Sequence, residues 1–188
     1  MKKILFPLAF VALFSVATTT TVSAQAKTKT VMVGGAAMYP TKNIIENAVN
    51  SKDHTTLVAA VKAAGLVETL SSAGPFTVFA PTNEAFNKLP AGTVETLVKP
   101  ESKATLTKIL TYHVVAGRMT SKDLVKAIKA GKGKATLKTV SGGTLTAMMK
   151  GPKGIELKDE KGGISTVTIA DVMQSNGVIH VIDTVLMP

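Results

Sequence analysis

The stretch FTVFAPTNEAF, residues 76–86, lies near the middle of the chain. Its first half is short, aromatic and β-branched and is bounded by Gly74-Pro75 and Pro81, which is typical of a strand. Thr82 and Asn83 follow with side chains that can cap a helix. The stretch therefore predicts a buried strand that runs directly into a capped helix. The residues expected in the core are Phe76, Val78, Phe79 and Phe86.

Helical patterns lie on both sides of this stretch. Apolar residues at helical spacing predict a helix from Asn43 and a second one after Asp53, which is its candidate cap. Gly65 is the candidate stop of that second helix. Beyond the central stretch, the same spacing predicts a helix that begins at Ser102 and another over residues 121–130.

The last third of the chain has a sequence pattern typical of strands. Short β-like runs separated by Gly-containing turns cover residues 135–140, 144–149, 154–158, 165–171 and 178–187. Asn176-Gly177 is expected to supply the positive backbone angles of a tight turn. The final run is apolar on both alternating faces, which predicts a central strand covered on both sides. Helices followed by antiparallel strands indicate an α+β fold.

Length and the N-terminal residues define the domain organisation. A chain of 188 residues, 45% of them hydrophobic, can bury one core of ordinary domain size. Two lysines, a short apolar run and small residues ending at Ala24 form the pattern of a secretory signal peptide, with cleavage two residues later as the alternative. The apolar run is too short for a lasting membrane anchor. We expect a cleaved signal peptide at 1–24, a flexible lead-in at 25–38 and one domain at 39–188.

The expected mature chain is basic and free of cysteine. Loss of Lys2 and Lys3 with the leader leaves 20 basic and 12 acidic residues, a charge that favours anionic partners. Nucleic acid is not expected, because the five remaining aromatic residues lie mostly in apolar runs and offer no stacking platform. Lys122, Lys126 and Lys129 share one side of the 121–130 helix. This pattern favours a solvated helix face, and an anion-binding stripe is the alternative.

Three stretches in register resemble the fasciclin family. They are residues 76–86, the sequence TYHVV at 111–115 and the sequence SNGVIHVID at 175–183. The resemblance extends from about Pro40 to Met187 and is greatest to single-domain secreted bacterial members, including relatives of mycobacterial secreted antigens and of a symbiosis-induced rhizobial protein. It implies a wedge-shaped β-sandwich flanked by several short helices, an extracellular location and adhesion. The residues that define the motifs are Phe76, Val78, Phe79, Pro81, Thr82, Asn83, Phe86, Asn176, Gly177, His180 and Asp183.

The resemblance also implies candidate binding residues. In animal members, integrin binding has been attributed to the tyrosine-histidine region and to an acidic tripeptide ahead of the last motif. The matching residues here are Tyr112 and His113, and Asp171, Val172 and Met173, although Ile169 and Ala170 depart from the usual preceding residues. From the residues alone, His113 and His180 are expected to be buried imidazoles, bonded to backbone or to a carboxylate such as Asp183. Asp171 could instead bond its own backbone in a turn.

Sequence patterns of catalysis are weak. The three histidines include no pair at the spacing that places two on one helix face for a metal, and no Gly-x-Ser-x-Gly elbow occurs. We therefore expect no metal, no cofactor and no enzymatic activity. The expected function is an exported, secreted or periplasmic interaction module that is not an integral membrane protein. It would bind an extracellular or cell-surface protein or polysaccharide, including anionic ones. The alternative is a periplasmic carrier that holds a small hydrophobic ligand in an apolar seam.

Overall fold

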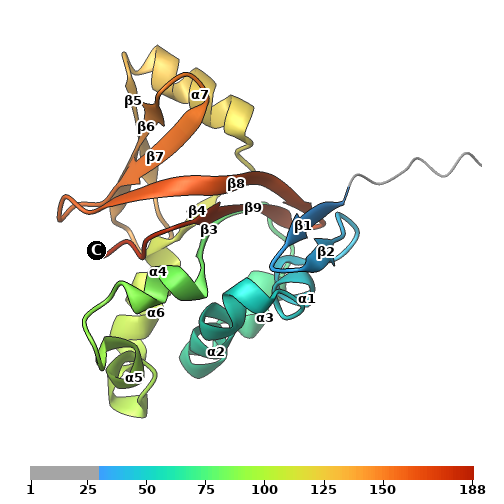
Figure 1. The fold of residues 1–188 in the computed structure, drawn as a ribbon, viewed down its shortest axis with the longest axis vertical. Helices are drawn as coiled ribbons and strands as arrows, with labels where there is room; N and C mark the ends of the chain where they lie inside the picture. The colour runs from blue at the N-terminus through green and yellow to red at the C-terminus, as the bar shows by residue number, and fades with distance from the viewer. Residues whose placement is uncertain (1–29) are drawn as a thin grey trace, which may run out of the picture.

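The computed structural model describes residues 30–188, so the expected signal peptide at 1–24 lies outside the described residues. Figure 1 shows short helices below a curved sheet, with one further helix above it. The helices are α1 (Ile44–Ala48), α2 (Thr55–Ala64), α3 (Val67–Ser71), α4 (Asn83–Asn87), α5 (Thr93–Leu97), α6 (Lys103–Tyr112) and α7 (Ser121–Ala130), with 3₁₀ turns at Lys52–His54 and Pro100–Ser102. The strands are β1 (Val31–Val33), β2 (Ala36–Met38), β3 (Phe76–Pro81), β4 (Val114–Ala116), β5 (Lys134–Lys138), β6 (Thr144–Lys150), β7 (Gly154–Lys158), β8 (Ile164–Gln174) and β9 (Gly177–Ile182).

Seven strands form one mixed sheet in the order β4-β3-β9-β8-β7-β6-β5. All neighbouring pairs are antiparallel except β3 and β9, which run parallel although most of the domain separates them in sequence. The two outer strands meet, because Val115 pairs with Thr139 and the Val140 amide donates to the Val114 carbonyl at 2.8 Å. The predicted α+β fold with short flanking helices is confirmed, and its two layers are halves of one nearly closed sheet.

The central pair β3 and β9 separates two hydrophobic cores. Every residue of β9 is buried, which confirms the predicted strand covered on both sides. Successive side chains of a strand point to opposite faces, so Val78 and Ile179 enter one core and Phe79 and Ile182 enter the other.

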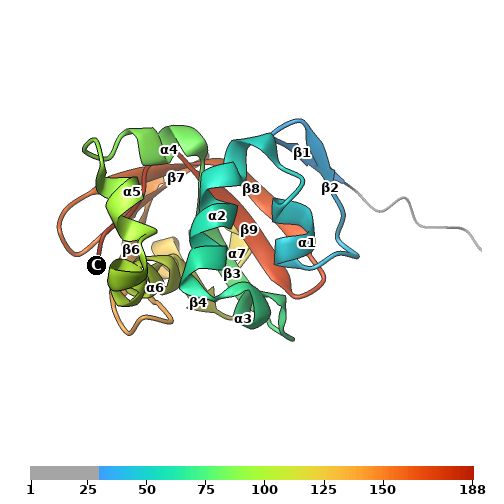
Figure 2. The same cartoon turned by 90° about the horizontal axis from the view of Figure 1, so that it is seen from below.

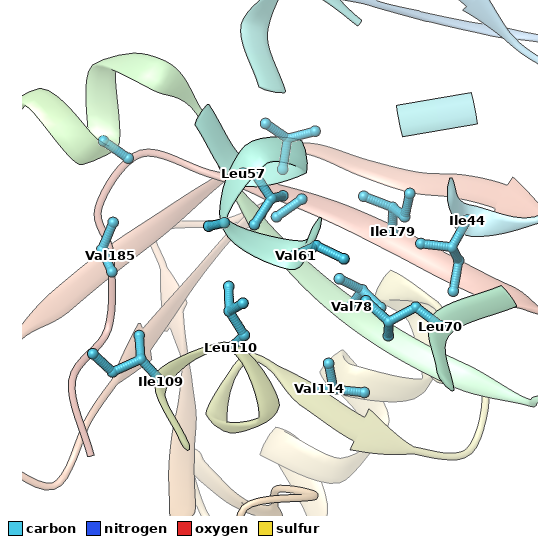
Figure 3. Close-up of a cluster of buried hydrophobic side chains, with 14 of the residues drawn as sticks. Ile44, Leu57, Val61, Leu70, Val78, Ile109, Leu110, Val114, Ile179 and Val185 are labelled. Carbon is cyan, nitrogen blue, oxygen red and sulfur yellow. The ribbon is translucent and has the colours of Figure 1, made fainter. Parts of the chain in front are cut away.

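We call the first the helix-side core, shown in Figure 3. Its members include Ile44, Leu57, Val61, Leu70, Val78, Ile109, Leu110, Val114, Ile179 and Val185. Helices α1 to α6 cover this side of the central strands (Figure 2). The second is the sheet-side core, which includes Phe79, Tyr112, Leu124, Ile128, Leu137, Leu145, Leu157, Ile182 and Leu186.

The capping of α4 agrees with the expectation, whereas the capping of α2 differs from it. Thr82 caps α4 as predicted, since its hydroxyl accepts the Ala85 amide hydrogen at 3.2 Å. Asp53 does not cap α2. Asn83, the first residue of α4, takes that role, because its side-chain oxygen accepts the Thr56 amide hydrogen at 3.0 Å. The predicted stop at Gly65 is confirmed by its left-handed conformation.

Residues 31–38 form a small hairpin of β1 and β2. The expectation of a flexible lead-in at 25–38 is therefore wrong for this part. Val33 and Met38 are buried in the helix-side core, and Gly34 and Gly35 make the turn with positive φ angles of 57° and 75°. Strands of three residues are too short for their periodicity to be recognised, and the burial of these two side chains stabilises the hairpin.

Ser175 and Asn176 connect β8 to β9, and Gly177 begins β9. Neither Asn176 nor Gly177 has a positive φ, so the predicted turn geometry is wrong. Glycine is required at 177 for a different reason: a Cβ there would lie 2.2 Å from the Phe76 carbonyl oxygen. The Asn176 side chain accepts from the Ile44 amide at 3.0 Å and donates to the Leu70 carbonyl at 2.8 Å. One buried amide side chain therefore joins the start of α1 to α3.

Candidate recognition surfaces

Tyr112 ends α6 with its ring wholly buried in the sheet-side core. Its hydroxyl donates to the Thr144 carbonyl at 2.6 Å and accepts the Glu160 amide hydrogen at 3.2 Å. Tyr112 thus fastens α6 to the start of β6 and to the turn after β7. The ring is buried and its hydroxyl makes hydrogen bonds within the molecule, so Tyr112 is not available to a partner at the folded surface.

His113 is also buried, and the structure defines its tautomer. Nδ1 donates to the Ile109 carbonyl at 2.8 Å, and Nε2 accepts the Leu186 amide hydrogen at 3.0 Å. The imidazole is therefore neutral with its hydrogen on Nδ1, and burial lowers the pKa of His113 to about 4. These contacts confirm the predicted buried imidazole bonded to backbone.

His180 has a similar position on β9. Its Nε2 donates to the Met119 carbonyl at 2.9 Å, Nδ1 accepts the Asp171 amide hydrogen at 3.3 Å, and its ring stacks on Phe79 with 5.6 Å between centroids. Burial lowers the pKa of His180. Asp183 is not its partner; that carboxylate accepts the Thr166 amide hydrogen at 2.8 Å instead.

Asp171 lies within β8, where the pairing with β9 shifts register, and it has a positive φ of 59°. Its carboxylate accepts hydrogen bonds from the amide, at 2.6 Å, and from the hydroxyl of Ser121, the first residue of α7. It therefore satisfies a free donor at a helix N-terminus. Asp171 does not lie on an exposed loop, and its carboxylate does not bond the backbone of a turn around it. Val172 is only 1% exposed, and Met173 is half-buried.

The two candidate binding regions do not combine into one exposed face. They are linked internally through Phe79, whose amide donates to the His113 carbonyl at 2.9 Å and whose ring stacks on His180. His180 in turn accepts from Asp171. This arrangement gives these motif residues a direct role in the fold.

Several open hollows lie elsewhere on the surface of residues 30–188, and two of them include basic side chains outside the sheet edge. One, of about 550 Å³, is bounded by the α1 N-terminus, residues 71–75 and Arg118, whose guanidinium donates to the Gln174 and Ser175 carbonyls at 3.3 and 3.2 Å. Sequence patterns give no indication of it, because its lining comes from four separate segments.

The second hollow, of about 330 Å³, lies between α7 and β7. It is lined by Ser121, Lys122, Val125, Lys126, Lys153 and Ile155, and we call it the α7 groove. The sequence identified the α7 lysines, but not Lys153, which the turn between β6 and β7 brings beside them. Within residues 30–188, no group of three His, Asp or Glu side chains is placed to hold a metal ion. No helix in this part is both long and apolar enough to cross a bilayer.

Comparison with known proteins defines the class. The fold matches the solved FAS1 domain pair from the insect cell adhesion molecule fasciclin I, with a TM-score of 0.69 and 22% identity over 80% of this chain and 52% of that chain. The fasciclin domain family model matches residues 52–188. The chain is 49% identical over 160 residues to protein sll1483 of Synechocystis, which covers 85% of this chain and 81% of the relative.

A second relative is the cell surface glycolipoprotein MPB83 of Mycobacterium bovis, 35% identical over 161 residues. That alignment covers 83% of this chain and 64% of MPB83, so this chain spans less than two thirds of the mycobacterial protein. The family match and the identity to the Synechocystis protein establish that this chain belongs to the fasciclin domain family.

Proposed function

We propose that the mature chain is an exported, non-enzymatic module that binds a protein or polysaccharide at a cell surface or in a matrix. Family membership is the observation that carries this proposal. One relative is named a cell surface glycolipoprotein, and the fold is similar to part of a FAS1 domain pair from a cell adhesion molecule. The basic signal-like start of the chain supports export.

The use of the titratable side chains supports binding over catalysis. A general acid, general base or nucleophile must be within hydrogen-bond reach of its substrate. Both ring nitrogens of His113 and of His180 bond to backbone groups, and the carboxylate of Asp171 bonds to Ser121. These groups hold elements of the fold together and present no reactive atom to a surface hollow.

The small apolar cavity under the β1–β2 hairpin does not support the carrier alternative. The enclosed apolar cavity under the β1–β2 hairpin is lined by Val33, Met38, Ala48, Ser51, His54, Ala80, Val172 and Ile179, and its volume is about 20 Å³. Pockets for small molecules commonly measure about 300–1,000 Å³. The cavity would have to grow by an order of magnitude to hold a hydrophobic ligand.

Attachment of labelled protein tests the proposal. Residues 25–188 would be incubated with intact cells and matrix extracts of the producing organism, and bound protein would be measured against concentration. We expect saturable binding that excess unlabelled protein displaces. The control is an exported protein of unrelated fold with a similar net charge. Binding no stronger than that control would contradict the proposal, and a small hydrophobe retained in native mass spectrometry would favour the carrier.

Export has a separate test. Mass analysis of the protein recovered outside the cytoplasm should find Gln25 as its first residue, because the small residues that end at Ala24 form the cleavage site. An exported protein that still begins at Met1 would contradict the predicted signal peptide.

A further inference from the structure

Positive charge is concentrated in one part of the molecule. Residues 30–115 carry seven basic and six acidic side chains, residues 116–163 carry eleven and four, and residues 164–188 carry none and two. The middle segment contains α7 and β5 to β7, which lie at the end of the molecule opposite α1 to α6 (Figure 1). A surface region of one sign attracts ligands of the opposite sign and raises their rate of association.

The acidic residues of this segment have hydrogen-bond or ion-pair partners of their own, although Asp123 lies on α7 close enough to Lys126 for the two charges to attract. Asp159 is buried and accepts the Met187 amide hydrogen at 3.0 Å, Asp123 forms the capping box of α7 with Thr120, and Glu160 accepts the Thr144 amide hydrogen at 2.8 Å. Glu156 pairs with Lys150 at 3.0 Å. Among the described residues, the lysines of the α7 groove form no ion pair with a carboxylate. Their charge is therefore available to a ligand.

The basic side chains follow the exposed face of α7. Lys122 and Lys126 line the groove, and Lys129 continues the same face at the next turn. With a rise of 1.5 Å per residue, Lys122 and Lys129 are about 10 Å apart along the helix axis. Lys153 joins the groove from the β6–β7 turn, while Val125 and the buried Ile155 contribute aliphatic lining. The groove thus combines a row of cations with a small apolar surface.

The composition of the groove indicates the class of ligand. Single-stranded nucleic acid is held by aromatic stacking, and no aromatic residue lines the groove. Membrane-surface binding uses bulky exposed apolar side chains, but the large exposed ones of residues 30–188 lie elsewhere: Met32, Tyr39, Val49, Val98, Val140 and Ile164. Protein interfaces favour aromatic residues and Arg and are depleted in Lys. An anionic polysaccharide fits best, because it offers repeated charges to separate lysines and C–H surfaces to the aliphatic lining.

We infer that the α7 groove is the binding site for an anionic polysaccharide, carboxylated or sulfated, held by Lys122, Lys126, Lys129 and Lys153. This inference rests on the proposed function and names the site and the ligand chemistry for it. It also assigns the α7 stripe a binding role in place of the solvated face that the sequence pattern favours.

The test compares two variants that lose the same charge. The groove variant is Lys122→Gln, Lys126→Gln, Lys129→Gln and Lys153→Gln. The matched control is Lys62→Gln, Lys99→Gln, Lys103→Gln and Lys108→Gln, all exposed lysines of the helical part. Affinity for polygalacturonate and for dextran sulfate would be measured at two salt concentrations, with neutral dextran as the blank and thermal melts to verify folding.

We expect the groove variant to bind at least one of the two polyanions at least tenfold more weakly than the native chain. The control variant should lose less than threefold, and both should melt like the native chain. Equal losses in the two variants would attribute binding to net charge and overturn the inference. So would native affinity in the groove variant, or binding by the native chain to vesicles containing anionic lipid but to neither polysaccharide.

Cell attachment separates this inference from the proposed function. If the groove variant attaches to cells and matrix as well as the native chain does, the inference fails and the proposed function stands. If the native chain attaches to neither cells, matrix nor polyanions, both fail.

Discussion

The two faces of the β3–β9 pair are filled in different ways. The helix-side core is filled mainly by aliphatic side chains, more than half of them from short helices, with Phe86 as its buried aromatic residue. Three of these helices depend on side chains from distant segments: Asn83 caps α2, and Asn176 joins α1 to α3. The sheet-side core contains Phe79 and Tyr112, beside the buried imidazole of His180. Each polar atom there has a named partner in the backbone.

This difference explains where recognition residues can lie. A partner that bound the polar groups of the fasciclin motif residues would have to break the hydrogen bonds that these groups make within the molecule. Breaking them would leave polar groups buried without a partner, which costs free energy. A surface of lysines on α7 can be occupied at no such cost. The motifs therefore identify the fold, and the side chains around them are free to determine the ligand.

The largest expected effect is on the sheet side. Phe79→Ala should lower the free energy of unfolding by about 3–5 kcal/mol, because the ring is fully buried and stacks on His180. Phe76→Ala, the same change on the helix-side face of the same strand, should cost only about 1–2 kcal/mol, since Phe76 is half-buried. Denaturant melts measure both. Similar losses for the two variants would mean that the two faces of β3 are filled alike.

Periodicity was sufficient to predict most of the elements. Strand β9 and helix α7 follow from alternation and helical spacing, and the predicted segments 121–130 and 154–158 coincide with α7 and β7. These patterns are local, and each segment contains enough residues to repeat them. The parallel pairing of β3 with β9 is not local, because it depends on how the intervening chain packs.

Three of the errors share a cause: each depends on a residue far away in sequence. Glycine is required at 177 because a Cβ there would clash with the carbonyl of Phe76, and α2 is capped by Asn83 in place of the nearby Asp53. Asp171 resembles a turn or binding residue in the sequence, yet its carboxylate is held by Ser121, fifty residues earlier. Such partners have no signature in either local sequence. The candidate site was therefore less predictable than the fold.

The His113 ring bonds to Ile109 of the helix-side core and to Leu186 of the sheet-side core, and acid should weaken this link. Desolvation lowers its pKa to about 4, against backbone and Asp159 contributions that raise it, whereas the unfolded chain has the ordinary value near 6.5. Its contribution to stability is therefore complete above pH 6.5 and is lost as the pH falls toward 4, where the unfolded state alone binds the proton. The loss is about 3 kcal/mol. Melts between pH 7.5 and 4 measure it.

His113→Gln is the variant that isolates this contribution. The variant should be less stable than the native chain at pH 7, because it loses the imidazole. The glutamine side chain cannot be protonated, so the variant should also lose less stability on acidification than the native chain. His54→Gln is the control on the helix side, because the pKa of His54 is also lowered by burial but His54 does not connect the two cores. An unchanged pH dependence in the His113 variant would mean that other groups cause the acid sensitivity.

A smaller effect is expected where β8 meets α7. Asp171→Ala removes the acceptor of the Ser121 amide and places alanine at a positive φ, so it should cost about 1–2 kcal/mol. Asp171→Asn retains an acceptor oxygen and a residue that tolerates this φ, and should cost less than half as much. Thermal melts of the pair test the assignment. If Asp171→Ala melts like the native chain but attaches more weakly to cells, Asp171 is a contact residue and not a cap.

The smallest effect should come from Met173, which is half-buried. Of the three residues in the expected acidic tripeptide, it is the one that could reach a partner without breaking a hydrogen bond and without leaving a core. Its neighbour Val172 is 1% exposed in the helix-side core, and the two side chains point to opposite faces of β8. Val172→Ala should therefore cost about 2 kcal/mol, and Met173→Ala less than about 1 kcal/mol, because part of the methionine surface is already in water. If recognition is by the α7 groove, Met173→Ala should also leave attachment to cells and matrix within twofold of the native chain. A well-folded Met173 variant that attaches more than tenfold more weakly would move the binding surface to β8, and it would do so without altering either core.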